Sequence, residues 1–130
     1  MRPVDQTLYG ANDGNCFAAS VASILEVPLA VVPHTFGVND EFLRWLAARG
    51  LSATIYDAAT YVPRGYAIAA GPSLRFAGRM HAVVAFDGKV VHDPHYSREG
   101  LPFGIVQYVV IHGPRREALW FNGIGGSAQR

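Results

Sequence analysis

The sequence NDGNC (residues 12–16) leads directly into FAASVASIL (residues 17–25). The first segment is rich in turn-forming residues, and the second repeats apolar side chains at spacings of three and four. This change predicts a helix from about Cys16 to Glu26, which ends before Pro28. A helix start presents unpaired N–H groups and the positive end of the helix dipole, and both lower the pKa of a thiol placed there. The sequence therefore predicts a reactive Cys16.

A second helix and about five strands follow. Asn39 or Asp40 can cap the second helix, and Gly50 ends it. Short apolar or alternating runs predict strands at residues 51–56, 65–70, 81–86, 89–93 and 105–112. This order indicates an α+β domain, with N-terminal helices packed on one side of an antiparallel sheet of about five strands.

The remaining segments are shorter. Residues 27–33 lie between prolines and predict a buried connection or a short helical turn. Residues 115–121 have the composition of a short helix, whereas residues 122–130 are glycine-rich and predict a flexible tail. Because no internal repeat or domain boundary is evident, we expect a single domain over residues 1–121.

The composition is typical of a compact globular chain, since half of the 130 residues are hydrophobic and 16% are charged. A net charge of +1 without a block of like charge makes nucleic acid a poor partner. No apolar run approaches the ~20 residues that span a membrane, and Asp5 interrupts any secretory signal. The single cysteine excludes an internal disulfide, so we expect a cytoplasmic protein. We also expect no cofactor.

Two later segments supply possible partners for the thiol. Nucleophilic catalysis by cysteine needs a thiolate, an imidazole that later protonates the leaving group, and a third group that orients the imidazole. His81 begins one predicted strand, and Asp93 ends the next. The order Cys16, His81, Asp93 therefore predicts a cysteine hydrolase.

The loop between these strands decides whether His81 and Asp93 meet. A two-residue turn at Asp87-Gly88 would leave Asp93 on the face opposite His81. A three-residue loop, Phe86-Asp87-Gly88 with Gly88 in a bulge, would place the two residues directly opposite each other. We predict the three-residue loop.

An acyl-transfer site also needs donors for the oxyanion that develops on the carbonyl. The backbone N–H of Cys16 supplies one donor at the helix start. Gln6 is an attractive second donor, because it lies upstream of the nucleophile on an extended segment. Asn12 and Asn15 are nearer to Cys16 in sequence and remain alternatives, although asparagine also suits a turn beside Gly14.

A metal site is a weaker interpretation. His92, Asp93 and His95 form a local cluster of possible ligands. Zinc sites usually need three or four well-placed ligands, and the sequence offers no second cluster, so we expect no metal. His34 and His112 are expected at the surface.

The motifs resemble the papain-like cysteine peptidase superfamily: Gln6 upstream, Gly14-Asn15-Cys16 opening a helix, Met80-His81-Ala82-Val83-Val84 on a strand, and Val91-His92-Asp93-Pro94 on the next. The pattern looks closest to the bacteriocin-leader-processing branch, also called the double-glycine peptidases. The match covers residues 6–26 and 79–96.

The resemblance implies a catalytic role for each matched residue. Cys16 would be the nucleophile, His81 the acid and base, Asp93 the orienting residue and Gln6 the oxyanion donor. The implied activity is cleavage of an amide, peptide or isopeptide bond in a peptide or protein substrate, through a thioacyl-enzyme. Deamidases and acyltransferases of the superfamily use the same triad, and a catalytically silent binding module on the same fold is the alternative from another class.

Overall fold

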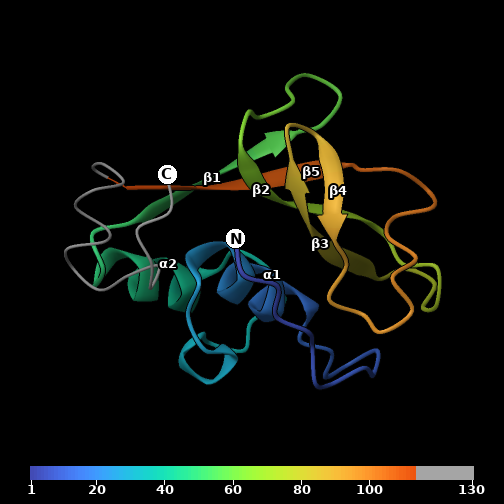
Figure 1. The fold of residues 1–130 in the computed structure, drawn as a ribbon, viewed down its shortest axis with the longest axis horizontal. Helices are drawn as coiled ribbons and strands as arrows, with labels where there is room; N and C mark the ends of the chain where they lie inside the picture. Colours follow the sequence, from blue (N-terminus) through green and yellow to red (C-terminus); the bar gives the residue numbers. More distant parts are fainter. Residues whose placement is uncertain (114–130) are drawn as a thin grey trace.

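The computed structural model describes residues 1–113, which contain two α-helices, a 3-10 helix and five strands. The helices are α1 (Cys16–Leu25), η1 (Leu29–Val31) and α2 (Asp40–Ala47). The strands are β1 (Ser52–Asp57), β2 (Tyr66–Pro72), β3 (Met80–Phe86), β4 (Lys89–His92) and β5 (Gln107–His112) (Figure 1). Each predicted helix and strand is confirmed to within a few residues. The helix predicted at 115–121 and the tail predicted at 122–130 lie outside the described residues.

The strands form one antiparallel sheet in the order β1-β5-β2-β3-β4. Both α-helices lie on one side of this sheet, with α1 against β3 and β2 and α2 against β1 (Figure 1). The predicted α+β class, with helices on one face of a five-stranded sheet, is therefore confirmed.

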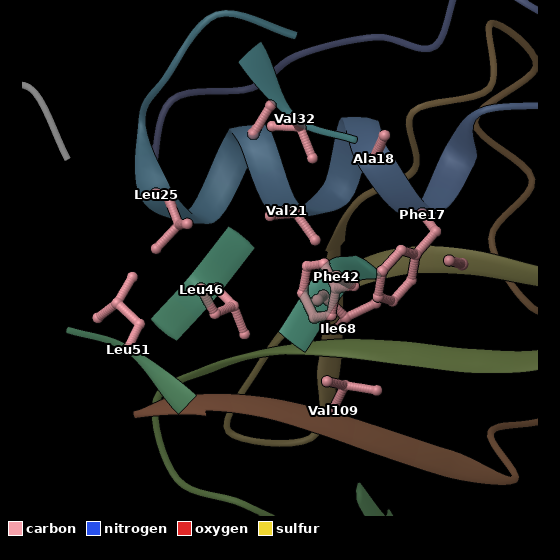
Figure 2. Packing of buried hydrophobic residues seen from close by; sticks show 12 residues of the cluster. Phe17, Ala18, Val21, Leu25, Val32, Phe42, Leu46, Leu51, Ile68 and Val109 are labelled. Carbon is pink, nitrogen blue, oxygen red and sulfur yellow. The ribbon is translucent and has the colours of Figure 1, made fainter. Parts of the chain in front are cut away.

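The main hydrophobic core lies between the helices and the sheet. Asn39 caps the start of α2, since its side chain accepts a hydrogen bond from the N–H of Phe42 at 2.9 Å, and the helix turns Phe42 and Leu46 inward. Phe42 packs edge-on against Phe17 of α1, with ring centroids 5.0 Å apart. Figure 2 shows this cluster, which joins α1 and α2 to the sheet through Val21, Leu25, Leu51, Ile68 and Val109. The start of α1 is thereby fixed against β3.

Residues 27–33 contain a short helical turn, η1, as one of the two predicted alternatives has it. Burial was the other alternative, and it is wrong for most of the segment. None of the η1 residues is buried, and Val31 is 44% exposed, although the following Val32 is buried.

The connection between β3 and β4 differs from the prediction. Phe86 pairs with Lys89, so Asp87 and Gly88 form a two-residue turn and not the three-residue loop. Both turn residues have positive φ, 51° at Asp87 and 81° at Gly88. These angles are those of a type I′ turn, which Asp-Gly favours because its twist matches that of the strands.

A β-bulge after this turn changes the register of the hairpin. Val91 is an extra residue in β4, and beyond it Val84 pairs with His92. Because a shift of one residue moves a side chain to the other face, the bulge brings Asp93 to the same face as His81. The two residues are hydrogen-bonded as expected, but through a bulge and not through a longer loop, and the pairing of Val84 with His92 does not place them directly opposite each other.

Candidate active site

Cys16 is the first residue of α1, at the edge of β3. Its Sγ accepts a hydrogen bond from the backbone N–H of Ala82, with 3.4 Å between nitrogen and sulfur. The N–H of Phe17 hydrogen-bonds to the same sulfur. The pairing of β4 with β3 ends at Val84. The sulfur contacts β3 at Ala82, in the part of the strand that β4 does not pair with. The side chain is neither fully buried nor freely exposed.

His81 and Asp93 form a buried pair. Nε2 of His81 lies 2.7 Å from Oδ1 of Asp93, and their side chains are only 6% and 2% exposed. His81 also hydrogen-bonds to the Cys16 thiol. Because Asp93 occupies Nε2, the nitrogen left for the thiol is Nδ1. The imidazole therefore bridges the sulfur and the carboxylate.

Backbone donors hold the Asp93 carboxylate in place. Oδ1 accepts a hydrogen bond from the N–H of His95 at 2.9 Å, and Oδ2 accepts one from the N–H of Gly100 at 2.7 Å. Arg98 donates to the backbone carbonyl of Asp93 at 2.5 Å and pairs with Asp5. The carboxylate thus has little freedom to turn away from the imidazole.

The electrostatics favour a thiolate beside an imidazolium. Burial raises the pKa of Cys16, but the hydrogen bond and charge of His81 outweigh it, so this pKa is lowered. Burial lowers the pKa of His81, but hydrogen bonds to Asp93 and Cys16 raise it to about 9. Burial raises the pKa of Asp93, yet hydrogen bonds from His81 and the backbone leave it lowered. Both shifts favour the state in which the proton between sulfur and imidazole resides on His81.

Gln6 lies in the same pocket as Cys16 and is 4% exposed. Its backbone N–H donates to the carbonyl of Pro94 at 3.1 Å, and its Nε2 donates to the carbonyl of Leu8 at 2.9 Å. Within residues 1–113 the second N–H of Nε2 has no acceptor, and Oε1 has no partner. Residues 9–14 form a loop. Its two ends are joined by a hydrogen bond from the N–H of Asn15 to the carbonyl of Leu8, at 3.2 Å. This loop brings Gln6 close to Cys16 despite their separation in sequence.

The two asparagines have other partners. Oδ1 of Asn15 accepts from the N–H groups of Thr7 and Leu8 at 2.9 and 3.0 Å, and its Nδ2 donates to Thr7 Oγ1 at 2.9 Å. Asn15 therefore clamps the segment that carries Gln6. Asn12 is exposed, and its Oδ1 accepts from Arg79 Nη2 at 2.7 Å.

Cys16, His81 and Gln6 line one pocket of about 300 Å³. Its other lining residues are mainly apolar. The buried apolar ones are Phe17, Ile68, Ala70, Ala82 and Val109, and the more exposed ones include Tyr9, Phe36, Phe76 and Met80. The thiol therefore lies in a pocket whose lining is mainly apolar.

His92 and His95 do not converge on one point. Nε2 of His92 lies 2.9 Å from the carbonyl oxygen of Val4, and Nδ1 of His95 lies 2.9 Å from Ser97 Oγ. Within residues 1–113, no group of three or more His, Cys, Asp or Glu side chains is placed to hold a metal ion.

His95 belongs to the site, although sequence reasoning considered it only as a metal ligand. Its buried ring lies edge-on to His81, with centroids 6.2 Å apart, and it lines the pocket. The sequence signal for this position was the Asp93-Pro94 dipeptide after β4, which is typical of a turn. That turn brings the backbone N–H of His95 back to the Asp93 carboxylate. His34 and His112 are not buried, in keeping with the surface positions predicted for them.

No family model, curated protein or solved structure matches this chain. None of the helices formed by residues 1–113 has the length and apolar character needed to cross a membrane.

Proposed function

We propose that this chain is a small cysteine hydrolase that cleaves an amide, peptide or isopeptide bond. The observation that carries the proposal is the line of Cys16, His81 and Asp93, in which the pKa of the thiol is lowered and that of the imidazole is raised to about 9. Burial opposes both shifts, so they reflect the contacts within the triad together with the backbone N–H groups of Ala82 and Phe17 on the sulfur. Such an ion pair is the reactive form of a catalytic cysteine.

The reaction follows from the positions of these groups. Sγ of Cys16 attacks the substrate carbonyl carbon and forms a C–S bond. His81 gives its proton to the leaving nitrogen, and the C–N bond breaks to leave a thioacyl-enzyme. His81 then takes a proton from water, which attacks the thioester and releases the acid and the thiol. Asp93 remains ionised and keeps Nδ1 of the imidazole directed at the sulfur.

The oxyanion would receive two hydrogen bonds. The N–H of Cys16 lies at the start of α1, where backbone donors lack intrahelical acceptors. Gln6 suits the role of second donor, because one N–H of its amide is unused and the amide is fixed by Leu8. Asn15 fits this role less well, since its side chain is already bonded to Thr7 and Leu8.

We place the chain in the papain-like superfamily, near the leader-processing branch, on the motifs around Gln6, Cys16, His81 and Asp93. Peptides or proteins are the proposed substrates. A thiolate nucleophile must stay reduced, which favours the cytoplasm as the site of action. A silent binding module would be favoured by a buried Cys16 out of reach of His81, whereas the thiol is partly exposed and hydrogen-bonds to that ring.

Alkylation with iodoacetamide at about pH 6 tests the proposal, because an unperturbed thiol is protonated there. We expect Cys16 to react faster than free cysteine, and Cys16→Ala to abolish cleavage of a peptide library. Product masses separate hydrolysis from acyl transfer and deamidation. If Cys16 reacts no faster than free cysteine and Cys16→Ala changes no activity, the proposal is wrong.

A further inference from the structure

The turn that precedes β3 is fixed by its own hydrogen bonds. The N–H of Ser73 donates to the carbonyl of Arg79 at 2.8 Å, which extends the pairing of β2 with β3 by one residue pair. Oγ of Ser73 accepts from the N–H groups of Arg75 and Phe76, both at 3.1 Å. Arg79 therefore projects from an ordered end of the hairpin.

Two arginines of this turn line the pocket, but their charges are balanced differently. Arg75 pairs with Glu99, with 3.0 Å between Nη1 and Oε1. Within residues 1–113 the Arg79 guanidinium donates only to the neutral Asn12, and no carboxylate there forms an ion pair with it. Most donors of the Arg79 guanidinium are therefore available to a ligand.

Arg79 lies two residues before His81, on the extended segment that leads into β3. Residues two apart on an extended strand project from one face and are separated by about 7 Å. Both side chains line the pocket that contains Cys16. The bond to Asn12 ties the guanidinium to the loop that precedes the nucleophile.

We propose that Arg79 binds a carboxylate of the substrate, within about two residues of the bond that Cys16 attacks. This inference rests on the proposed hydrolase function and names its substrate class: peptides that combine an apolar residue with an acidic group. Phe36, Phe76 and Met80 line the same pocket and supply the apolar surface. The guanidinium is exposed, but a neutral amide orients it beside these apolar side chains, so it can bind a carboxylate through charge-assisted hydrogen bonds. The carboxylate can come from a glutamate side chain or from a chain end.

Two matched pairs of thiol reagents test this inference without a known substrate. N-iodoacetyl-leucine carries a free carboxylate, and its amide does not. N-iodoacetyl-glutamic acid α-amide carries a side-chain carboxylate, and the glutamine α-amide analogue does not. In each case sulfur displaces iodide, so the rate ratio of acid to amide, divided by the ratio for free cysteine, measures recognition of the carboxylate at Cys16.

We expect this normalised ratio to be about ten or more in the wild-type protein for at least one pair. Arg79→Gln should lower it about tenfold, and Arg79→Glu should lower it further. Arg64→Gln is the matched control, because it removes the same charge from an exposed site at the other end of β2 and should keep the wild-type ratio. The pair that responds identifies the source of the carboxylate.

Equal ratios in the wild-type protein and in Arg79→Gln would overturn the inference, as would a wild-type ratio of one for both pairs. If Arg79→Gln keeps a ratio above one, we assign that remainder to the imidazolium of His81. Only the decrease from the wild-type ratio measures the contribution of Arg79. The amide reagents report separately on the proposed function. If they alkylate Cys16 no faster than free cysteine, the reactive thiol is disproved, while the acid-to-amide ratio still decides the role of Arg79.

Discussion

Nε2 of His81 lies 2.7 Å from Oδ1 of Asp93, although the turn that joins their strands begins in a register that would separate them. The bulge at Val91 corrects that register. Two N–H groups from the following turn then fix the carboxylate. The geometry of the dyad is therefore specified by the path of the chain after β4 as well as by the two residues themselves.

Asp93→Asn should shift the pH range of activity. Burial lowers the pKa of His81, and the contact with Asp93 is the strongest influence that raises it, to about 9. Because the active ion pair needs a protonated His81, wild-type activity should fall only as the pH rises through about 9. The substitution removes the negative charge beside the imidazole, so the fall should begin at lower pH. The pH profile of kcat/KM measures this shift, and an unchanged alkaline limb would contradict the role of Asp93.

Gln6→Ala should separate amide cleavage from thiol alkylation. Loss of one oxyanion donor typically lowers kcat by about a hundredfold to a thousandfold. Alkylation by iodoacetamide forms no oxyanion, so the alkylation rate of Cys16 should stay close to wild type. Asn12→Ala is the comparison, and because the Asn12 side chain also holds Arg79, both variants are assayed on a substrate without a carboxylate near the cleaved bond. If Asn12→Ala slows cleavage more than Gln6→Ala does, the donor is assigned to the wrong residue.

Asn15→Ala should destabilise the fold by about 1–3 kcal/mol, because the buried Asn15 side chain makes three partly buried hydrogen bonds that the substitution removes. The lost bonds are those to Thr7 and Leu8. Urea unfolding measures the loss. Cleavage should also weaken, since the same bonds hold the segment of Gln6. A variant with wild-type stability would show that this clamp is unimportant.

Phe42→Ala should cost about 3–5 kcal/mol of unfolding free energy. The Phe42 side chain is fully buried and packs on Phe17, the residue that follows the nucleophile. Leu43→Ala on the same helix is the control, because Leu43 is 38% exposed and should cost much less. Equal losses for the two variants would disprove the assignment of the core face of α2.

Local patterns in the sequence predicted most of the fold. The spacing of Phe42 and Leu46 and the cap at Asn39 predicted α2, because these features depend on neighbouring residues alone. The bulge at Val91 was missed, since a bulge is decided by which cross-strand contacts a whole hairpin makes.

The same distinction applies to the site. Cys16 was found from its place at a helix start, and His81 and Asp93 from their places at strand ends. The contact of Arg79 with Asn12 joins loops far apart in the chain, so no local pattern indicates it.

The most direct test of the account is the pKa of the Cys16 thiol in the folded protein. Cys16 is the only cysteine of the chain, so the difference in ultraviolet absorbance between the wild-type protein and Cys16→Ala, followed with pH, reports its thiolate alone. We predict a midpoint well below the value of about 8.5 of a free cysteine, and a higher midpoint in His81→Gln. A midpoint at or above that of free cysteine, unaffected by His81→Gln, would contradict the account.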